Sequence, residues 1–200
     1  MAPAVSWQSI SADEILSYNG SVSDLVGSGP ALYLWKRNFR PQPKDMADSV
    51  LFMAWLRRVI SAPVAEMEGI RIAHFLTVRG ISLSGELTEI KDGYLASFSK
   101  SEKGRKIILK FLDDLAGQAP ALYVGETDKV SRRVLDHLNG ETLFGTQINE
   151  SEHLGWSDLE FHYLELKIKD PESANSKDFR TALEQIAANV TIAGLTKRAG

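Results

Sequence analysis

Cysteine is missing from all 200 residues of the sequence. Disulfide bonds and thiolate metal sites are therefore excluded, which fits a reducing compartment. No apolar run is long enough for a transmembrane helix, and the first residues carry neither the basic nor the apolar stretch of a signal peptide. These absences lead us to expect a soluble protein of the cytoplasm that has no membrane partner.

A strong positive charge is also lacking, because 23 Lys and Arg stand against 26 Asp and Glu, a formal net charge of −3. This balance argues against a protein that coats nucleic acid. The charge is nevertheless uneven, and residues 31–140 hold 17 Lys and Arg against 13 Asp and Glu. An enzyme needs only such a local positive surface to hold a phosphate backbone.

Apolar periodicity and capping signals predict an α/β (α+β) chain with a small antiparallel β-sheet flanked by helices. The predicted helices are 11–18, 44–60, 101–116, 128–139 and 178–192, and the predicted strands are 31–35, 70–79, 120–125 and 158–168. Asp92-Gly93 predicts a hairpin turn, so that 70–98 forms a small β-meander. The glycine-rich stretch 140–157 is typical of a loop.

The stretch Pro120–Thr127 with the helix that follows it carries the most suggestive chemistry. It predicts a buried strand that ends at Tyr123, then a turn at Gly125, then a helix with Arg132, Arg133 and His137. Arg133 and His137 are four residues apart and share one helix face. A phenol, a guanidinium and an imidazole at one end of a sheet suit an anionic substrate and proton transfer.

A second tyrosine strand lies far upstream. Pro30–Leu34 and Pro120–Val124 share the pattern Pro-Ala-Leu-Tyr followed by an aliphatic residue. Five residues are too few to be a repeat. They predict two strands of one sheet that present Tyr33 and Tyr123 at a similar level.

Together these motifs resemble the GIY-YIG endonucleases. Ala31-Leu32-Tyr33 is similar to the first triplet of that family and Tyr123-Val124-Gly125 to the second, with a small polar residue at Thr127. Arg133 and His137 match the Arg-x-x-x-His pattern of its first helix. Ala182-Leu183-Glu184 on the last predicted helix resembles the motif that supplies a metal-binding glutamate. The matching pieces cover less than half of the chain.

The sequence departs from the family in three places. The first triplet has no glycine, Tyr33 and Tyr123 are 90 residues apart where the family has a short connection, and no asparagine follows Glu184 at the usual offset. We therefore expect a single domain with a GIY-YIG-like core over 28–36 and 119–195. The insertion 37–118 would add a long helix and a β-hairpin.

The resemblance implies a metal-dependent endonuclease that hydrolyses phosphodiester bonds of DNA. Glu184 would hold Mg²⁺ or Mn²⁺, and Arg133 would neutralise the scissile phosphate. Tyr33 or Tyr123 would orient or deprotonate the attacking water, and His137 would relay a proton. Arg132 competes with Arg133 for its role, and Glu160 and Glu165 compete with Glu184.

A freestanding chain with an elaborated core suits a restriction or defence nuclease that acts as a homodimer on symmetric sites, with repair and mobile-element nucleases as alternatives. Basic residues of and beside the insertion would grip the DNA backbone. The predicted DNA-binding residues are Lys36, Arg37, Arg40, Arg71, Arg79, Lys129 and Arg132. The alternative is a non-catalytic module that binds nucleic acid or protein through a degenerate GIY-YIG core.

Overall fold

The computed structural model describes residues 6–61, 70–73, 76–78, 87–117, 119–151, 154–166 and 177–191. The chain divides into two compact units, which are described separately. The first unit comprises 1–38 and 115–200, and the second comprises 39–114. The second unit occupies nearly the same residues as the expected insertion 37–118.

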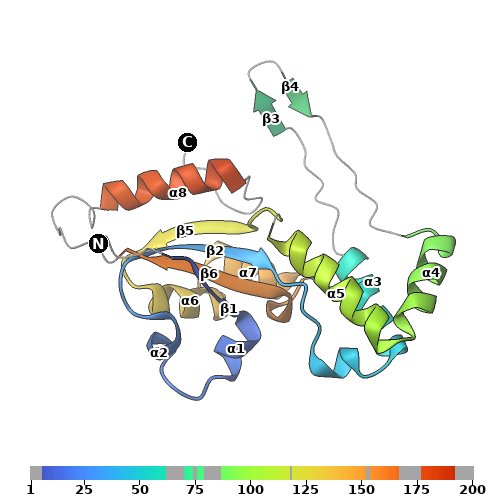
Figure 1. The fold of residues 1–200 in the computed structure, drawn as a ribbon. Helices are drawn as coiled ribbons and strands as arrows, with labels where there is room; N and C mark the ends of the chain where they lie inside the picture. Colours follow the sequence, from blue (N-terminus) through green and yellow to red (C-terminus); the bar gives the residue numbers. More distant parts are fainter. Residues whose placement is uncertain are drawn as a thin grey trace. The chain divides into compact units, whose positions relative to one another are not determined.

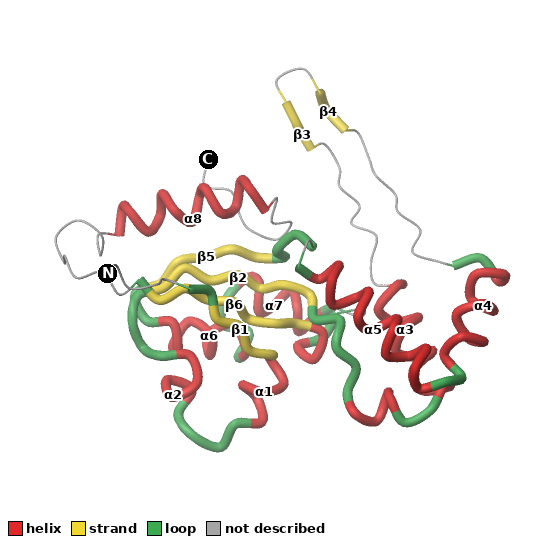
Figure 2. Tube along the Cα trace, viewed as in Figure 1, coloured by secondary structure: helices red, strands yellow, loops and turns green. Residues whose placement is uncertain are grey.

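The first unit is built on a four-stranded sheet in which every pair of neighbours is antiparallel (Figure 2). Its strands are β1 (Gln8–Ser11), β2 (Ala31–Arg37), β5 (Tyr123–Thr127) and β6 (Leu159–Glu165), in the order β1-β6-β2-β5. The predicted fold class, a small antiparallel sheet flanked by helices, is confirmed. The two tyrosine strands belong to one sheet, as their shared pattern predicts, and the structure makes them direct neighbours.

One face of β2 carries the aromatic core of the unit. Successive strand residues point to opposite faces, so Ala31, Tyr33 and Trp35 share one side, and all three are buried. On the neighbouring strands, Trp35 lies opposite Tyr123 and Phe161, while Tyr33 lies opposite Gly125 and Tyr163. The resulting layer of rings fixes the register of the three strands.

Helices cover both faces of this sheet (Figure 1). The aromatic face is covered by α1 (Ala12–Ser17), α2 (Val22–Val26), α6 (Val130–Leu138) and α7 (Leu143–Glu150), which bury apolar side chains against it. On the opposite face, α8 (Lys177–Thr191) packs against β5 and β2. The sheet therefore lies between the helix that carries Arg133 and the helix that carries Glu184.

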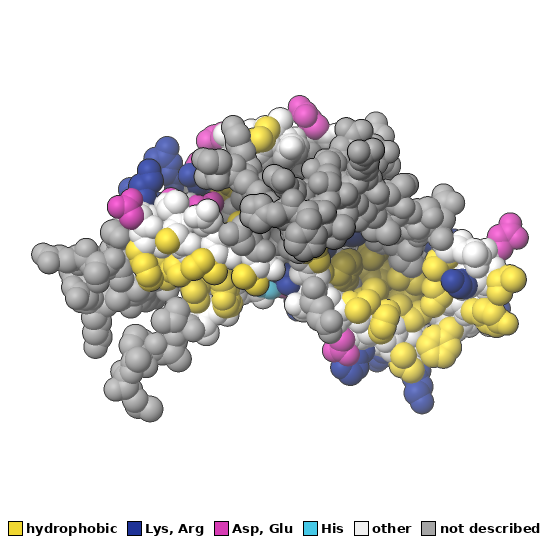
Figure 3. All heavy atoms as spheres, turned by 90° about the horizontal axis from the view of Figure 1, so that it is seen from above, with side chains coloured by type: hydrophobic (Ala, Val, Ile, Leu, Met, Phe, Trp, Pro, Cys, Tyr) yellow, Lys and Arg dark blue, Asp and Glu magenta, His cyan; other side chains and the backbone are white. Residues whose placement is uncertain are grey.

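The second unit is a small helical bundle. A short 3-10 helix, η1 (Pro43–Met46), precedes α3 (Ser49–Ser61), α4 (Glu89–Ser99) and α5 (Glu102–Ala116). Its core includes Phe52, Trp55 and Ile108. Ile90, Tyr94, Phe98, Ile107 and Phe111 stay exposed on α4 and α5, and Figure 3 shows apolar side chains gathered over this unit.

Several predicted elements are confirmed and others are wrong. The helices 11–18, 101–116 and 178–192 and the strands 31–35 and 158–168 are present as α1, α5, α8, β2 and β6. Ser11 caps α1 by accepting a hydrogen bond from the Glu14 N–H. The predicted loop 140–157 instead contains α7, because the Thr142 side chain caps a helix there, and it also contains the 3-10 turn η2 (Trp156–Asp158). The structure adds β1 and α2, which the sequence did not predict.

Three further predictions are wrong for local reasons. The helix predicted over 44–60 starts only at Ser49, since the Asp48 carboxylate accepts the N–H groups of Val50 and Leu51 and so caps it. Asp92-Gly93 lies inside α4 and forms no turn, because the Asp92 carboxylate binds Arg57 on α3.

The predicted strand 70–79 is two strands, β3 (Ile70–Ala73) and β4 (Leu76–Val78), which pair as a hairpin. No glycine, proline or other usual turn residue interrupts the alternating pattern 70–79, so the sequence hid the break. His74, Phe75 and Arg79 lie outside the described residues. In the described part of the chain, no helix is long and apolar enough to cross a membrane.

Gly125 lies within β5, and this corrects the glycine turn predicted at the end of the strand. The Tyr33 ring on the neighbouring strand crosses directly over Gly125, and a Cβ atom there would overlap the phenol. The glycine is thus required by the close approach of the ring.

We predict that Gly125→Ala lowers the free energy of unfolding of the first unit by about 1–3 kcal/mol, because the new methyl group displaces Tyr33. Urea denaturation followed by tryptophan fluorescence measures this. Gly93→Ala is the matched control, since no atom lies within 4 Å of a Cβ at this helical position, and it should stabilise by up to about 1 kcal/mol. A Gly125→Ala protein as stable as the wild type would contradict the packing argument.

Candidate functional site

The helix α6 follows the strand β5 through a short ordered turn. The Thr127 hydroxyl accepts the Lys129 N–H at 3.2 Å, and the helix begins at Val130. Val130 and Val134 bury one face of the helix against the sheet, while Arg132 and Arg133 remain partly exposed. This local geometry places the arginines beside the end of β5.

His137 lies fully buried under the aromatic face of the sheet, with 0% of its surface exposed. Its Nε2 atom is 3.0 Å from the Tyr33 hydroxyl, and its Nδ1 atom is 2.6 Å from the Thr142 hydroxyl. Thr142 also accepts the Gly145 N–H and caps α7. The imidazole therefore joins β2 to the start of α7 through two hydrogen bonds.

Tyr123 completes this aromatic group. Its ring centre is 6.0 Å from that of Tyr33, 5.2 Å from that of His137 and 4.9 Å from that of Phe144. Tyr33 is only 1% exposed, whereas Tyr123 is half-buried. The structure thus brings the two predicted tyrosines and the predicted histidine together, with Tyr123 nearer to solvent.

Burial keeps Tyr33 and His137 uncharged at neutral pH. It raises the pKa of Tyr33 well above its usual value of about 10, and the Tyr123 phenol adds to that effect. Burial also lowers the pKa of His137 to about 3, helped by the positive charge of Arg133. A neutral imidazole donates at one nitrogen and accepts at the other, so it can bridge the Tyr33 and Thr142 hydroxyls without a charge.

The positive charge of Arg133 acts on three of the other candidate residues. Burial is the largest cause of the shifted pKa values of Tyr33, His137 and Glu184, and in each case the Arg133 charge lowers the pKa. The Arg133 side chain is 40% exposed, and its nearest carboxylate, that of Asp136, is 4.0 Å away. It can therefore reach an anion without leaving a tight ion pair.

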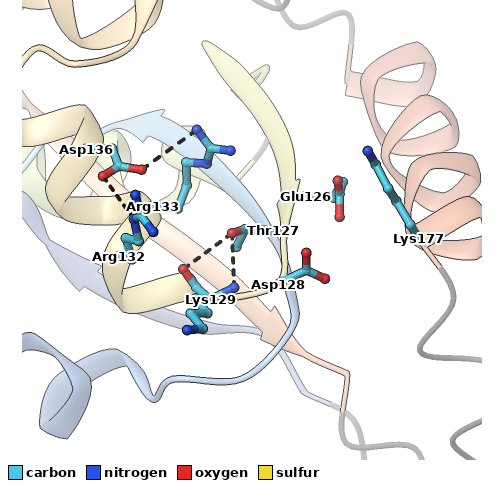
Figure 4. Close-up of a pocket in the computed structure, with 8 residues that line it drawn as sticks. All are labelled: Glu126, Thr127, Asp128, Lys129, Arg132, Arg133, Asp136 and Lys177. Atoms are coloured by element: carbon cyan, nitrogen blue, oxygen red, sulfur yellow. Dashed lines mark hydrogen bonds and ion pairs between the residues drawn. The ribbon is translucent and has the colours of Figure 1, made fainter.

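A pocket of about 440 Å³ opens beside Arg133 (Figure 4). Its lining residues are Glu126, Thr127, Asp128, Lys129, Arg132, Arg133, Asp136 and Lys177. The cations come from two elements, α6 with its preceding turn and the start of α8, and they flank the end of β5. Among the five predicted catalytic residues, only Arg133 lines this pocket, and the tyrosine–histidine group lies under the sheet.

Glu184 lies on α8, half-buried, within electrostatic reach of this pocket. Burial raises its pKa, and the nearby Glu126 carboxylate raises it further. In the described part of the chain, no group of three or more His, Cys, Asp and Glu side chains could hold a metal ion. A Mg²⁺ ion that keeps most of its waters needs only one or two carboxylate ligands, and Glu184 is the carboxylate that the sequence marks for this role.

Lys129 and Arg132 line the pocket, whereas Lys36 and Arg37 of the first unit are not among its lining residues. Lys36 donates to the Gly117 carbonyl, and Arg37 is partly buried, which lowers its pKa. Arg40 lies 3.9 Å from Asp113 in the second unit. The backbone of Arg71 belongs to β3, and Arg79 lies outside the described residues.

Arg132 and Glu160, two residues that compete for the predicted roles of Arg133 and Glu184, have different surroundings from them. Arg132 is 78% exposed, and it is Arg133 whose charge acts on Tyr33 and His137. Glu160 binds His162 at 3.0 Å on β6. Arg133 and Glu184 are therefore better placed than these two rivals.

The sequence interpretation missed Arg180, Lys177 and Thr142. Arg180 is four residues before Glu184, and this spacing is the signal that could have drawn attention to it. Thr142 was missed because its segment was predicted to be a loop.

A scan against protein-family models finds no match, and neither the search of curated proteins nor that of solved structures finds one.

The lowered pKa of His137 predicts how stability changes with pH. The unfolded chain binds the proton near pH 6.5, whereas the folded chain resists it until about pH 3. The stabilisation is complete above pH 6.5 and is lost as the pH falls, with a slope of up to about 1.4 kcal/mol per pH unit.

Urea denaturation between pH 7 and pH 5 measures this slope. Replacing Trp55 by Phe restricts the fluorescence to Trp7, Trp35 and Trp156, which all belong to the first unit. His137→Gln should flatten the slope, and His162→Gln on the opposite sheet face should retain it. Equal slopes for wild type and His137→Gln would contradict the assigned pKa shift.

Proposed function

We propose that this chain is a metal-dependent DNA endonuclease of the GIY-YIG type that acts in the cytoplasm. The observation that carries the proposal is the convergence of Tyr33 and Tyr123, 90 residues apart, on His137, with Arg133 acting electrostatically on both this group and Glu184. These are the residues that the resemblance marks as catalytic.

In this proposal the pocket binds the DNA backbone. The planar guanidinium of Arg133 contacts two oxygens of the scissile phosphate, because its fork matches their geometry. Lys129, Arg132 and Lys177 line the same pocket and neutralise the neighbouring phosphates. Asp136, 4.0 Å from Arg133, forms no tight ion pair with it, so the guanidinium can bind the phosphate.

The two tyrosines have different roles in positioning the attacking water. Tyr123 is the more exposed of the two and orients the water. Tyr33 is buried and holds His137 by its 3.0 Å hydrogen bond; the imidazole in turn holds the Thr142 hydroxyl, and this pair packs against the Tyr123 ring and positions it. Glu184 would hold Mg²⁺ or Mn²⁺, and the cation would supply charge stabilisation at the phosphate when bound. The raised pKa of Glu184 makes cation binding increase with pH.

The biological setting that we propose is restriction or defence. A symmetric target sequence would then be cleaved by a homodimer, because a two-fold protein matches a two-fold site. Repair and mobile-element nucleases use the same chemistry.

A second candidate is a non-catalytic module that binds nucleic acid through the same pocket. It is favoured by the burial of Tyr33 and His137, which leaves no charged base in that pair at neutral pH. Both candidates predict DNA binding through Arg133, and only the first predicts cleavage.

We predict that the wild-type protein nicks or linearises plasmid DNA with Mg²⁺ or Mn²⁺ and that chelation by EDTA abolishes the reaction. Glu184→Gln and Arg133→Ala should each lower the cleavage rate by roughly 10²–10³-fold, since each removes charge stabilisation at the phosphate. Gel electrophoresis of timed samples gives the rates.

Glu150→Gln on α7 is the matched control, because this glutamate is exposed and lies outside the pocket. It should cleave at the wild-type rate. Cleavage by Glu184→Gln equal to that of the wild type would rule out the enzymatic proposal. Arg133-dependent DNA binding without any cleavage would favour the binding module.

A further inference from the structure

Arg180 is a buried arginine that the proposed chemistry does not use. It lies on α8 and is only 2% exposed. Its Nε atom donates to Glu126 at 2.9 Å, and its terminal nitrogen donates to Asp128. A buried guanidinium with two carboxylate partners is a strongly held group, because each charge depends on the others for its solvation.

The two carboxylates belong to different parts of the chain. Glu126 lies in β5, and Asp128 lies in the turn that leads into α6. Thr127, between them, accepts the Lys129 N–H and thereby orders this turn. One guanidinium on α8 therefore grips both the end of the strand and the turn from which the helix of Arg133 starts.

Glu184 follows Arg180 by four residues on the same helix. Residues at this spacing lie one above the other on one helix face. The face that Arg180 presses against β5 is thus the face that carries Glu184, and Glu184 responds electrostatically to both Glu126 and Arg133. Any shift of α8 along or away from β5 would change the distance between Glu184 and Arg133.

We propose that Arg180 is a positioning residue that clamps α8 to the β5–α6 turn and so sets Glu184 at its working distance from Arg133. This inference rests on the proposed nuclease function. Because Arg180 already binds the Glu126 carboxylate, Glu184 is the carboxylate that remains to bind the cation. Lysine cannot replace it, because a single ammonium group does not present the two separated donors that contact Glu126 and Asp128.

The sharpest test uses the double variant Arg180→Gln with Glu126→Gln, which removes the clamp without changing the net charge. We expect its kcat for plasmid cleavage to fall about 100-fold, as a shift of about 1 Å at the reacting centre produces. KM for DNA should stay within about threefold, since Arg132 and Arg133 on α6 remain. Arg180→Lys should lower kcat about tenfold. This single variant tests the clamp if the double variant does not fold.

The matched control is Arg57→Gln, which also breaks two arginine–carboxylate hydrogen bonds, here with Asp92 in the second unit. It should leave kcat and KM unchanged. A purely structural role for Arg180 would lower kcat and raise KM together or reduce the fraction of folded protein, and this outcome would overturn the inference.

Mn²⁺ binding followed by electron paramagnetic resonance gives a readout that does not need cleavage. The double variant should bind Mn²⁺ about tenfold more weakly than the wild type, with Glu184→Gln as the reference for loss of the site. If the wild type cleaves DNA and Arg180→Lys and the double variant match it in kcat and Mn²⁺ affinity, the clamp is refuted and the nuclease stands. If the wild type neither cleaves nor binds Mn²⁺, the proposed function and the clamp both fail.

Discussion

The hydrogen bond between the Tyr33 phenol and the His137 imidazole is the contact on which the candidate site depends. It forms because β2 and β5 pair with Tyr33 opposite Gly125, where the lack of a side chain leaves room for the phenol ring. The same pairing brings Tyr123 against both rings. The absence of a side chain at Gly125 thus allows Tyr33 and Tyr123, which are distant in the sequence, to pack in a single aromatic group.

Burial and charge then separate two regions of the first unit. The tyrosine–histidine pair is kept neutral beneath the sheet, because desolvation disfavours both the phenolate and the imidazolium. The charges gather at the end of β5, where the cations of α6 and α8 line the pocket and Arg180 joins Glu126 and Asp128. Arg133 links the two regions, since its charge acts on both.

Sequence patterns predicted the elements of the core but not their contacts. The strands of Tyr33 and Tyr123 were found because each is a short apolar run bounded by turn residues, and the helix of Glu184 because its apolar stripe is regular. Gly125 was assigned to a turn, since no local pattern reveals that a ring from a distant strand will cover it. Arg180 binds Glu126 and Asp128, which are 54 and 52 residues away from it in the sequence, so these contacts depend on the packing of α8 on β5.

The second unit shows the same limit. Asp92-Gly93 favours a hairpin turn by local propensity, yet it lies in α4, where Asp92 pairs with Arg57 of α3.

The proposal that Glu184 and Arg133 act together on one phosphate is tested most directly by a crystal structure with Mn²⁺ and a DNA duplex. We expect an anomalous manganese peak bonded to a Glu184 oxygen, with a phosphate against Arg133. A manganese ion bound elsewhere, or a phosphate remote from Arg133, would contradict it.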